Sequence, residues 1–272
     1  MDTKQLKWIY LAILSLIWGS SFILIKKGLI GLTAIQVGSF RIIFAALFLL
    51  IFGFNSLKKI SRRQWKYVAI TSLFGTFVPA YLFAIAETQV NSSIVAILNS
   101  LTPLNTLVLG IIAFGIQFQR RQVLGVFVGL VGCLLLVLSG DSSSGTQNYL
   151  YVVLVVIATL SYAINVNLIK KYLHDLNSVS ITTGNFAVLF LPALIILSTT
   201  DIGQKIHFAE TQHSILFVMI LGVLGTGIAN ILFFKLIQMS SPVFAISVTY
   251  LIPIVALFWG LLDNEFLTPI QS

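Results

Sequence analysis

The chain has 272 residues, of which 58% are hydrophobic and only 9% are charged, and its mean hydropathy is +1.01. Soluble domains carry about 25% charged residues, so this composition excludes a soluble enzyme or binding domain and predicts an all-α, polytopic membrane protein. The net charge of +8 does not predict a nucleic-acid partner, because the basic residues lie in short groups between apolar runs.

Nine apolar segments follow one another along the chain, each long enough to cross about 30 Å of hydrocarbon as a helix. They are expected at residues 8–25, 34–54, 66–86, 91–116, 122–139, 149–169, 179–199, 214–237 and 242–262. The first is too long for the apolar part of a signal peptide and is interpreted as a retained span. The single cysteine, Cys133, excludes a disulfide within the chain and predicts no metal cluster.

The loops predict the orientation of the chain. Basic residues concentrate in the loops on the same side as the N-terminus, and the richest of these runs from Lys58 to Lys66. An excess of Lys and Arg marks cytoplasmic loops, so the N-terminus is expected in the cytoplasm.

Two stretches of sequence recur. LIWGSSFILIKK from Leu16 aligns without gaps with LSYAINVNLIKK from Leu160, at an offset of 144 residues. LFGTFVPAYLF from Leu73 aligns with VLGTGIANILF from Val223, at an offset of 150 residues. Ordered matches at nearly one spacing predict an internal repeat, the first pattern to seek in a sequence.

Each repeat would hold five segments, an odd number, so the second would enter the membrane from the opposite side. We therefore expect two inverted five-helix repeats at residues 1–140 and 148–272, as in secondary transporters whose site lies near the middle of the bilayer. The second repeat lacks a partner for segment 122–139, so a tenth helix is expected to be missing and the chain to be truncated, or else to have nine spans naturally.

Arg41 is the clearest candidate functional residue, because it lies inside the second segment with no acid nearby in that segment. Ionisable groups inside a membrane are costly and are candidates for function by default. A guanidinium can hold a carboxylate or phosphate with two hydrogen bonds. The alternative is a structural arginine that reaches toward the interface or bonds helix-end carbonyls.

Other polar or aromatic residues lie within the segments and must find partners in lipid. Each either faces a cavity or bonds across helices as structural glue. These candidates are Trp18, Tyr81, Asn99, Asn165, Asn167, Asn185, Asn230, Thr249 and Tyr250. Pro103 and Pro253 are paired by the second offset, and they are candidate hinges or static kinks.

Several short motifs resemble the EamA family of the drug/metabolite transporter superfamily, over the whole chain. They are Trp18-Gly19-Ser20-Ser21-Phe22, Phe40-Arg41, Leu101-Thr102-Pro103-Leu104, Tyr250-Leu251-Ile252-Pro253 and the stretch from Trp259-Gly260 to Glu265-Phe266-Leu267-Thr268-Pro269. The resemblance implies ten helices in two inverted units, both termini in the cytoplasm, and a central cavity for the export of small metabolites across the inner (plasma) membrane.

The sequence thus predicts a secondary transporter that exports small solutes, with amino acids or related anions as candidates, by alternating access. It gives no ATP-binding loop, catalytic set, metal site or cofactor site, and no acid at mid-depth in any span, which favours facilitated export or exchange. The expected partners are a small-molecule solute and the lipid bilayer, with a monomer favoured. The alternatives are a non-transporting assembly or receptor subunit and, third, a membrane-embedded enzyme.

Overall fold

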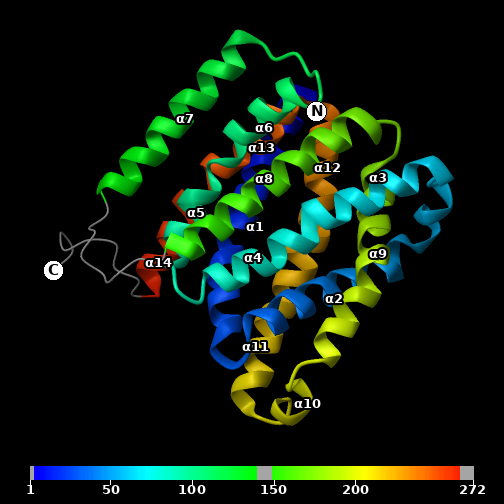
Figure 1. Ribbon diagram of the computed structural model, residues 1–272, viewed down its shortest axis with the longest axis vertical. Helices are drawn as coiled ribbons and strands as arrows, with labels where there is room; N and C mark the ends of the chain where they lie inside the picture. The colour runs from blue at the N-terminus through cyan, green and yellow to red at the C-terminus, as the bar shows by residue number, and fades with distance from the viewer. Residues whose placement is uncertain (1–2, 140–148, 264–272) are drawn as a thin grey trace.

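The computed structural model describes residues 3–139 and 149–263, with side chains described at 5–132 and 150–263. Over these residues the protein is an all-α bundle (Figure 1). The first half comprises α1 (Thr3–Gly31), α2 (Ala34–Gly53), η1 (Phe54–Lys59), α3 (Arg62–Ser72), η2 (Leu73–Phe77), α4 (Val78–Ala86), α5 (Ser92–Asn99), α6 (Thr102–Ile112) and α7 (Arg120–Ser139).

The second half follows the same plan. It comprises α8 (Tyr149–Tyr172), α9 (Ser178–Ser198), α10 (Ile202–Lys205), α11 (Ala209–Ile220), η3 (Leu221–Ile228), α12 (Ala229–Met239), α13 (Pro242–Ile246), η4 (Ser247–Tyr250) and α14 (Ile252–Leu262). The Cys133 side chain and residues Glu265–Pro269 of the family motif lie outside the described residues.

Within the described part of the chain, eight helical stretches are long and apolar enough to cross a membrane. They coincide with eight of the nine predicted segments, and the ninth, 122–139, falls on α7. Large apolar side chains face outward from the bundle, with Phe52 77% and Ile112 79% exposed. Such exposure is expected where lipid, not water, surrounds the protein. The all-α, polytopic membrane fold is therefore confirmed.

Four of the spans are interrupted, which the apolar pattern did not predict. Two of them contain π-helical turns, η2 and η3, at equivalent places in the two aligned stretches. The other two break at Ser100–Leu101 and at η4–Leu251, directly before Pro103 and Pro253. A proline fits the first turn of a helix, where its missing N–H has no partner to lose, so each helix restarts there.

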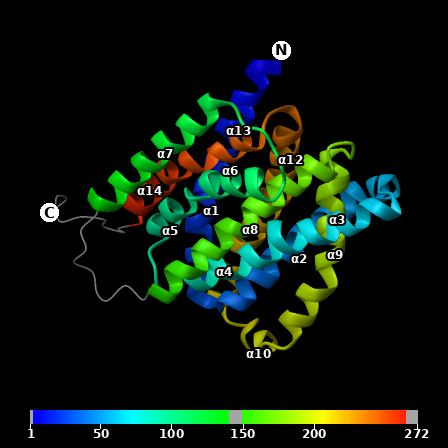
Figure 2. The ribbon, with the colours of Figure 1, turned by 45° about the horizontal axis from the view of Figure 1, so that its top comes forward.

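The two halves pack against each other across the bundle (Figure 2). Helix α2 lies along α9, its counterpart in the repeat. Helix α1 packs on α11, α12 and α14, whereas α8 packs on α4 and α6, which is the same arrangement with the halves exchanged. Helix α7 runs along the outside of the bundle beside α5, α6 and α13. The first helix of each half is thus enclosed by the third and fourth spans of the other half.

Candidate functional site

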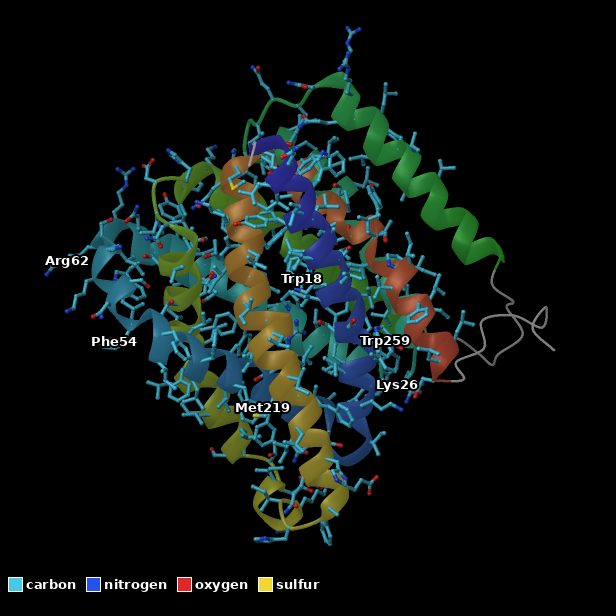
Figure 3. All side chains as sticks on the ribbon, turned by 180° about the vertical axis from the view of Figure 1, so that it is seen from behind. Trp18, Lys26, Phe54, Arg62, Met219 and Trp259 are labelled. Carbon is cyan, nitrogen blue, oxygen red and sulfur yellow. The ribbon has the colours of Figure 1, made fainter. Side chains whose placement is uncertain are left out.

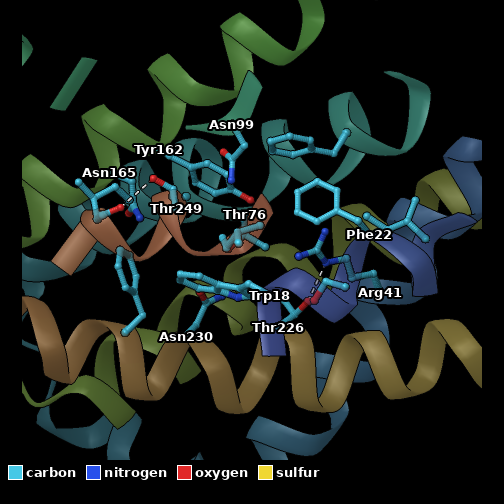
Figure 4. A pocket seen from close by; sticks show the side chains of 17 residues that line it. Trp18, Phe22, Arg41, Thr76, Asn99, Tyr162, Asn165, Thr226, Asn230 and Thr249 are labelled. Atoms are coloured by element: carbon cyan, nitrogen blue, oxygen red, sulfur yellow. Dashed lines mark hydrogen bonds between the residues drawn. The ribbon is translucent and has the colours of Figure 1, made fainter. Parts of the chain in front are cut away.

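A pocket lies between the two halves (Figure 4). Its walls come from α1, α2, η2, α4 and α5 of the first half, and from α8, η3, α12, α13, η4 and α14 of the second. The cavity volume is about 70 Å³, which at roughly 30 Å³ per molecule is room for about two water molecules. Pockets that bury a drug-sized ligand measure roughly 300–1,000 Å³, so the cavity as it stands is smaller than a solute of that size requires.

The structure brings six of the ten predicted site residues together in this pocket. They are Trp18, Arg41, Asn99, Asn165, Asn230 and Thr249. Among the described side chains that line it, Arg41 is the one that carries a formal charge. The pocket is therefore an apolar and amide-lined space with a single fixed cation.

Arg41 is almost fully buried, with 9% of its surface exposed. Its Nε donates a hydrogen bond of 2.7 Å to Thr226 Oγ1, and Thr226 in turn donates to the carbonyl of Leu221 at 3.1 Å. The guanidinium points into the pocket, on the side of Thr76 and Phe22 (Figure 4). A charge desolvated in this way is costly unless it is paired; the carboxylate of Glu87 attracts it from outside the pocket lining, and an anion in the pocket would stabilise it further.

Trp18 is held by η3, the π-helical turn that also contains Thr226. Its Nε1 donates a hydrogen bond of 3.0 Å to the carbonyl of Gly225, the residue before Thr226. The indole also meets the ring of Phe233 edge-on, with centroids 4.8 Å apart. Helix η3 therefore holds the largest aromatic side chain and the one cation of the pocket through two adjacent residues, as expected of a π-bulge at a functional site.

Pocket residues occur in pairs related by the repeat. The offsets of 144 and 150 residues match Trp18 with Tyr162, Ser21 with Asn165, Thr76 with Thr226, Phe83 with Phe233, and Asn99 with Thr249. All ten members of these pairs line the pocket. Arg41 breaks the symmetry, because its partner Asn185 lies elsewhere. The two halves thus contribute similar walls but only one of them contributes a charge.

The paired glycines in the π-helical turns face the first helix of the opposite half. A Cβ on Gly75 would lie 2.4 Å from Cγ of Asn165, and one on Gly225 would lie 2.7 Å from Oγ of Ser21. Ser21 and Asn165 are repeat partners, so the same contact is made twice. Glycine leaves room for the side chains of Asn165 and Ser21, so a larger residue at either position would require those side chains to move.

The other four predicted residues lie outside the pocket lining. Tyr81 Oη is 2.9 Å from Ser39 Oγ, and Tyr250 Oη donates to the carbonyl of Val126 at 3.0 Å. Asn167 donates to the carbonyls of Thr106 and Ala163 at 3.0 and 2.9 Å. Asn185 contacts Thr71 Oγ1 at 3.1 Å and the carbonyl of Val68 at 3.0 Å. Each bonds across helices, which is the alternative reading of a polar residue in a span.

Sequence reasoning missed other residues that line the pocket. They are Ser21, Phe22, Ile25, Gly75, Thr76, Phe83, Tyr162, Thr226, Phe233, Ile246 and Ile252. The repeat was the signal that could have found several of them, since Tyr162 is the partner of Trp18. Pro103 and Pro253 lie next to the breaks that carry Asn99 and Thr249 toward the pocket.

Side chains join the two halves at the helix ends. Lys26 Nζ lies 2.7 Å from Asp263 Oδ2, and Lys27 bonds the other oxygen, so the end of α1 is tied to the end of α14. Figure 3 shows Lys26 on the side of α1 near the end of α14. Burial alone would raise the pKa of Asp263, but the hydrogen bonds from Lys26 and Lys27 outweigh it and hold that pKa below its ordinary value. Lys171, the repeat partner of Lys27, donates instead to the carbonyl of Phe114 beyond α6, at 2.8 Å.

Comparison with known proteins identifies the family. The model of the EamA-like transporter family matches residues 6–138 and again residues 149–271. The chain belongs to the EamA-like transporter family. It is therefore a membrane transporter and not an enzyme, and the two matches are consistent with an inverted-repeat fold.

Several transporters are similar to this protein over most of the chain. The uncharacterized inner membrane transporter YedA of Escherichia coli is 27% identical over 277 residues, covering all of this chain and 88% of its own length. An uncharacterized transporter of Archaeoglobus fulgidus is 23% identical, with 93% and 88% covered. The S-adenosylmethionine/S-adenosylhomocysteine transporter of Chlamydia muridarum is 25% identical, with 92% and 82% covered.

A solved crystal structure shares the fold. It has a TM-score of 0.69 and 13% sequence identity, and the match covers 95% of this chain and 88% of the other. At this identity the likeness bears on the arrangement of helices and not on the solute.

Proposed function

We propose that this EamA-family transporter exports small organic anions from the cytoplasm by alternating access between its two halves, 1–140 and 148–272, with the N-terminus in the cytoplasm. The observation that carries the proposal is the position of Arg41: a buried cation lining a pocket between the halves. Trp18 and Tyr162 add aromatic walls that suit an apolar or planar part of the solute.

The small cavity volume supports alternating access. At about 70 Å³ the pocket holds little more than water, while the helix ends are tied at Lys27–Asp263 and at Lys171–Phe114. A solute could enter only if one of these ends separated. In an inverted repeat, the same motion in the two halves would open opposite sides of the membrane.

The pocket can also be compared with the solutes named for the Chlamydia muridarum relative. S-adenosylmethionine and S-adenosylhomocysteine both carry a carboxylate that suits Arg41, but both also carry a cationic ammonium group, and the former a sulfonium as well, and these cations would find no acidic side chain among the described residues of the pocket. We therefore expect this chain to favour anions without a second, cationic centre.

The test is untargeted metabolite measurement in the medium of cells expressing the protein, beside Arg41→Ala and Arg62→Ala variants. Arg62 is exposed at the start of α3 and serves as the matched arginine control. We expect anionic compounds enriched outside cells with the native protein and Arg62→Ala, but not with Arg41→Ala. Enrichment that survives Arg41→Ala would contradict the anion site, and no enrichment with any inserted form would favour a non-transporting subunit.

A further inference from the structure

We propose that Thr226 is a positioning residue that determines selectivity: it holds Arg41 so that only the two terminal nitrogens of the guanidinium meet the solute, as a fork for a planar carboxylate. This inference rests on the proposed function and adds to it the shape of the anionic group and the residue that selects it.

The hydroxyl of Thr226 can act only as a hydrogen-bond acceptor toward Arg41. A hydroxyl has a single proton and two acceptor lone pairs. Thr226 directs that proton to the carbonyl of Leu221, five residues earlier, at 3.1 Å. Its oxygen is then left as the acceptor for Arg41 Nε, at 2.7 Å. The hydroxyl is thus held in one orientation by the backbone of η3, with 2% of the residue exposed.

The π-helical turn makes this contact possible. In η3 the backbone bonds shift to a five-residue spacing, as in the bond from Ala229 N–H to the Leu224 carbonyl. Gly222 lies against α2 so closely that a Cβ on it would be 2.9 Å from the backbone oxygen of Arg41. Because the two backbones touch, the short side chain of Thr226 reaches Nε at the near end of the guanidinium.

Occupying Nε changes what the guanidinium can bind. A carboxylate can meet arginine from the side, through Nε and one terminal nitrogen, or from the end, through both terminal nitrogens. Because Thr226 already accepts the hydrogen bond from Nε, a carboxylate cannot bind from the side. The terminal nitrogens have no hydrogen bond among the described residues, and the group points into the pocket (Figure 4). A flat group with two oxygens fits this end-on fork better than a single hydroxyl or a neutral amide does.

The repeat supplies a matched comparison residue. Thr76 occupies the equivalent place in η2, lines the same pocket and is 4% exposed. Its Oγ1 has no hydrogen-bond partner among the described residues. Thr76 and Thr226 therefore share residue type, turn and burial, and differ in the bond to Arg41.

The experiment measures affinity of the purified full-length protein for two probes, phenylacetate and the uncharged phenylacetamide, by isothermal titration calorimetry. Wild type should bind phenylacetate more tightly. Thr226→Val should lower that preference by about tenfold, the scale of one charge-assisted hydrogen bond. Thr226→Ser keeps the hydroxyl and should restore the preference to within about twofold of wild type. Thr182→Val is the control, because Thr182 is a buried threonine outside the pocket whose hydroxyl donates to the carbonyl of Ser178 in its own helix; it should leave the preference as in wild type.

The outcomes separate this inference from the proposed function. A wild-type preference that Arg41→Lys lowers but Thr226→Val leaves unchanged would overturn the role of Thr226 and keep the anion site. Loss of preference in Thr226→Ser as well as in Thr226→Val would also overturn it, because the hydroxyl would not be the cause. Equal affinity of the wild type for both probes, or binding of neither, would refute the anion site and the positioning role together.

Discussion

Replacing Gly75 with alanine tests the contact between the halves. The new Cβ would lie 2.4 Å from Asn165 Cγ and 2.5 and 2.6 Å from its amide nitrogen and oxygen. Real contacts of this kind lie beyond 3.0 Å, so the Asn165 side chain or the two helices must shift. Forcing an extra carbon into a packed interior costs about 1–3 kcal/mol. We expect the free energy of unfolding to fall by that amount.

The matched control is Gly125→Ala on the exposed side of α7. A Cβ there would meet no atom within 4 Å. Alanine is a better helix residue than glycine by about 0.5–1 kcal/mol, so this change should be neutral or stabilising. The assay is equilibrium unfolding in mixed detergent–SDS micelles at one temperature.

A double-mutant cycle makes the argument specific. Adding Asn165→Ala to Gly75→Ala removes the side chain that the new Cβ would strike, so the pair should lose less stability than the sum of the single changes. If Gly75→Ala unfolds like Gly125→Ala, or if the two effects simply add, then η2 and α8 do not touch as described and the cross-repeat contact is refuted.

Three further predictions follow from single contacts. Trp18→Phe leaves the Gly225 carbonyl without its indole donor and should lower the free energy of unfolding by about 1–3 kcal/mol. The control Trp8→Phe, at a residue 58% exposed, should change that free energy by less than about 0.5 kcal/mol. Equal effects of the two variants would contradict the buried hydrogen bond. The pKa of Asp263 is lowered in the folded protein, so the stability that its pairing gives is complete above about pH 4 and is lost as the pH falls through the folded-state pKa. The free energy of unfolding measured from pH 7 to 3 should show this loss. The Asp263→Asn variant should abolish the loss, whereas the Glu210→Gln variant should not. Lys170→Met removes donors to the Ser240 and Ile237 carbonyls at the end of α12 and should cost about 0.5–1.5 kcal/mol in the same unfolding assay, with little effect expected from Lys66→Met as the control.

Length and apolarity predicted where the helices lie, because a span must satisfy its backbone within itself and needs a fixed number of apolar residues. They did not predict the breaks inside four spans. The Gly75-Thr76 and Gly225-Thr226 stretches were visible as repeat partners, but apolar content is the same for an α- and a π-helical turn. The choice between the two depends on contacts from the other half, which no local pattern contains.

Only part of the candidate site could be predicted, because the direction in which a side chain points depends on packing between helices. Asn165 and Asn167 were both singled out, yet residues two apart on an α-helix point about 200° away from each other, so one faces the pocket and the other faces α6. Which one faces inward depends on how α8 is rotated, and packing sets that rotation. Thr226 escaped notice because a threonine in an apolar run usually bonds its own helix, as this one also does.

The two ties at the helix ends differ in chemistry although their lysines are repeat partners. At one end, Lys26 and Lys27 meet the carboxylate of Asp263, a contact between full charges that dissolved ions weaken. At the other, Lys171 meets a backbone carbonyl, which carries no charge to screen or to protonate. Salt and acid are therefore expected to weaken the contact at Asp263 more than the contact at Phe114, so two halves with matching sequences differ in how solution conditions affect their helix ends.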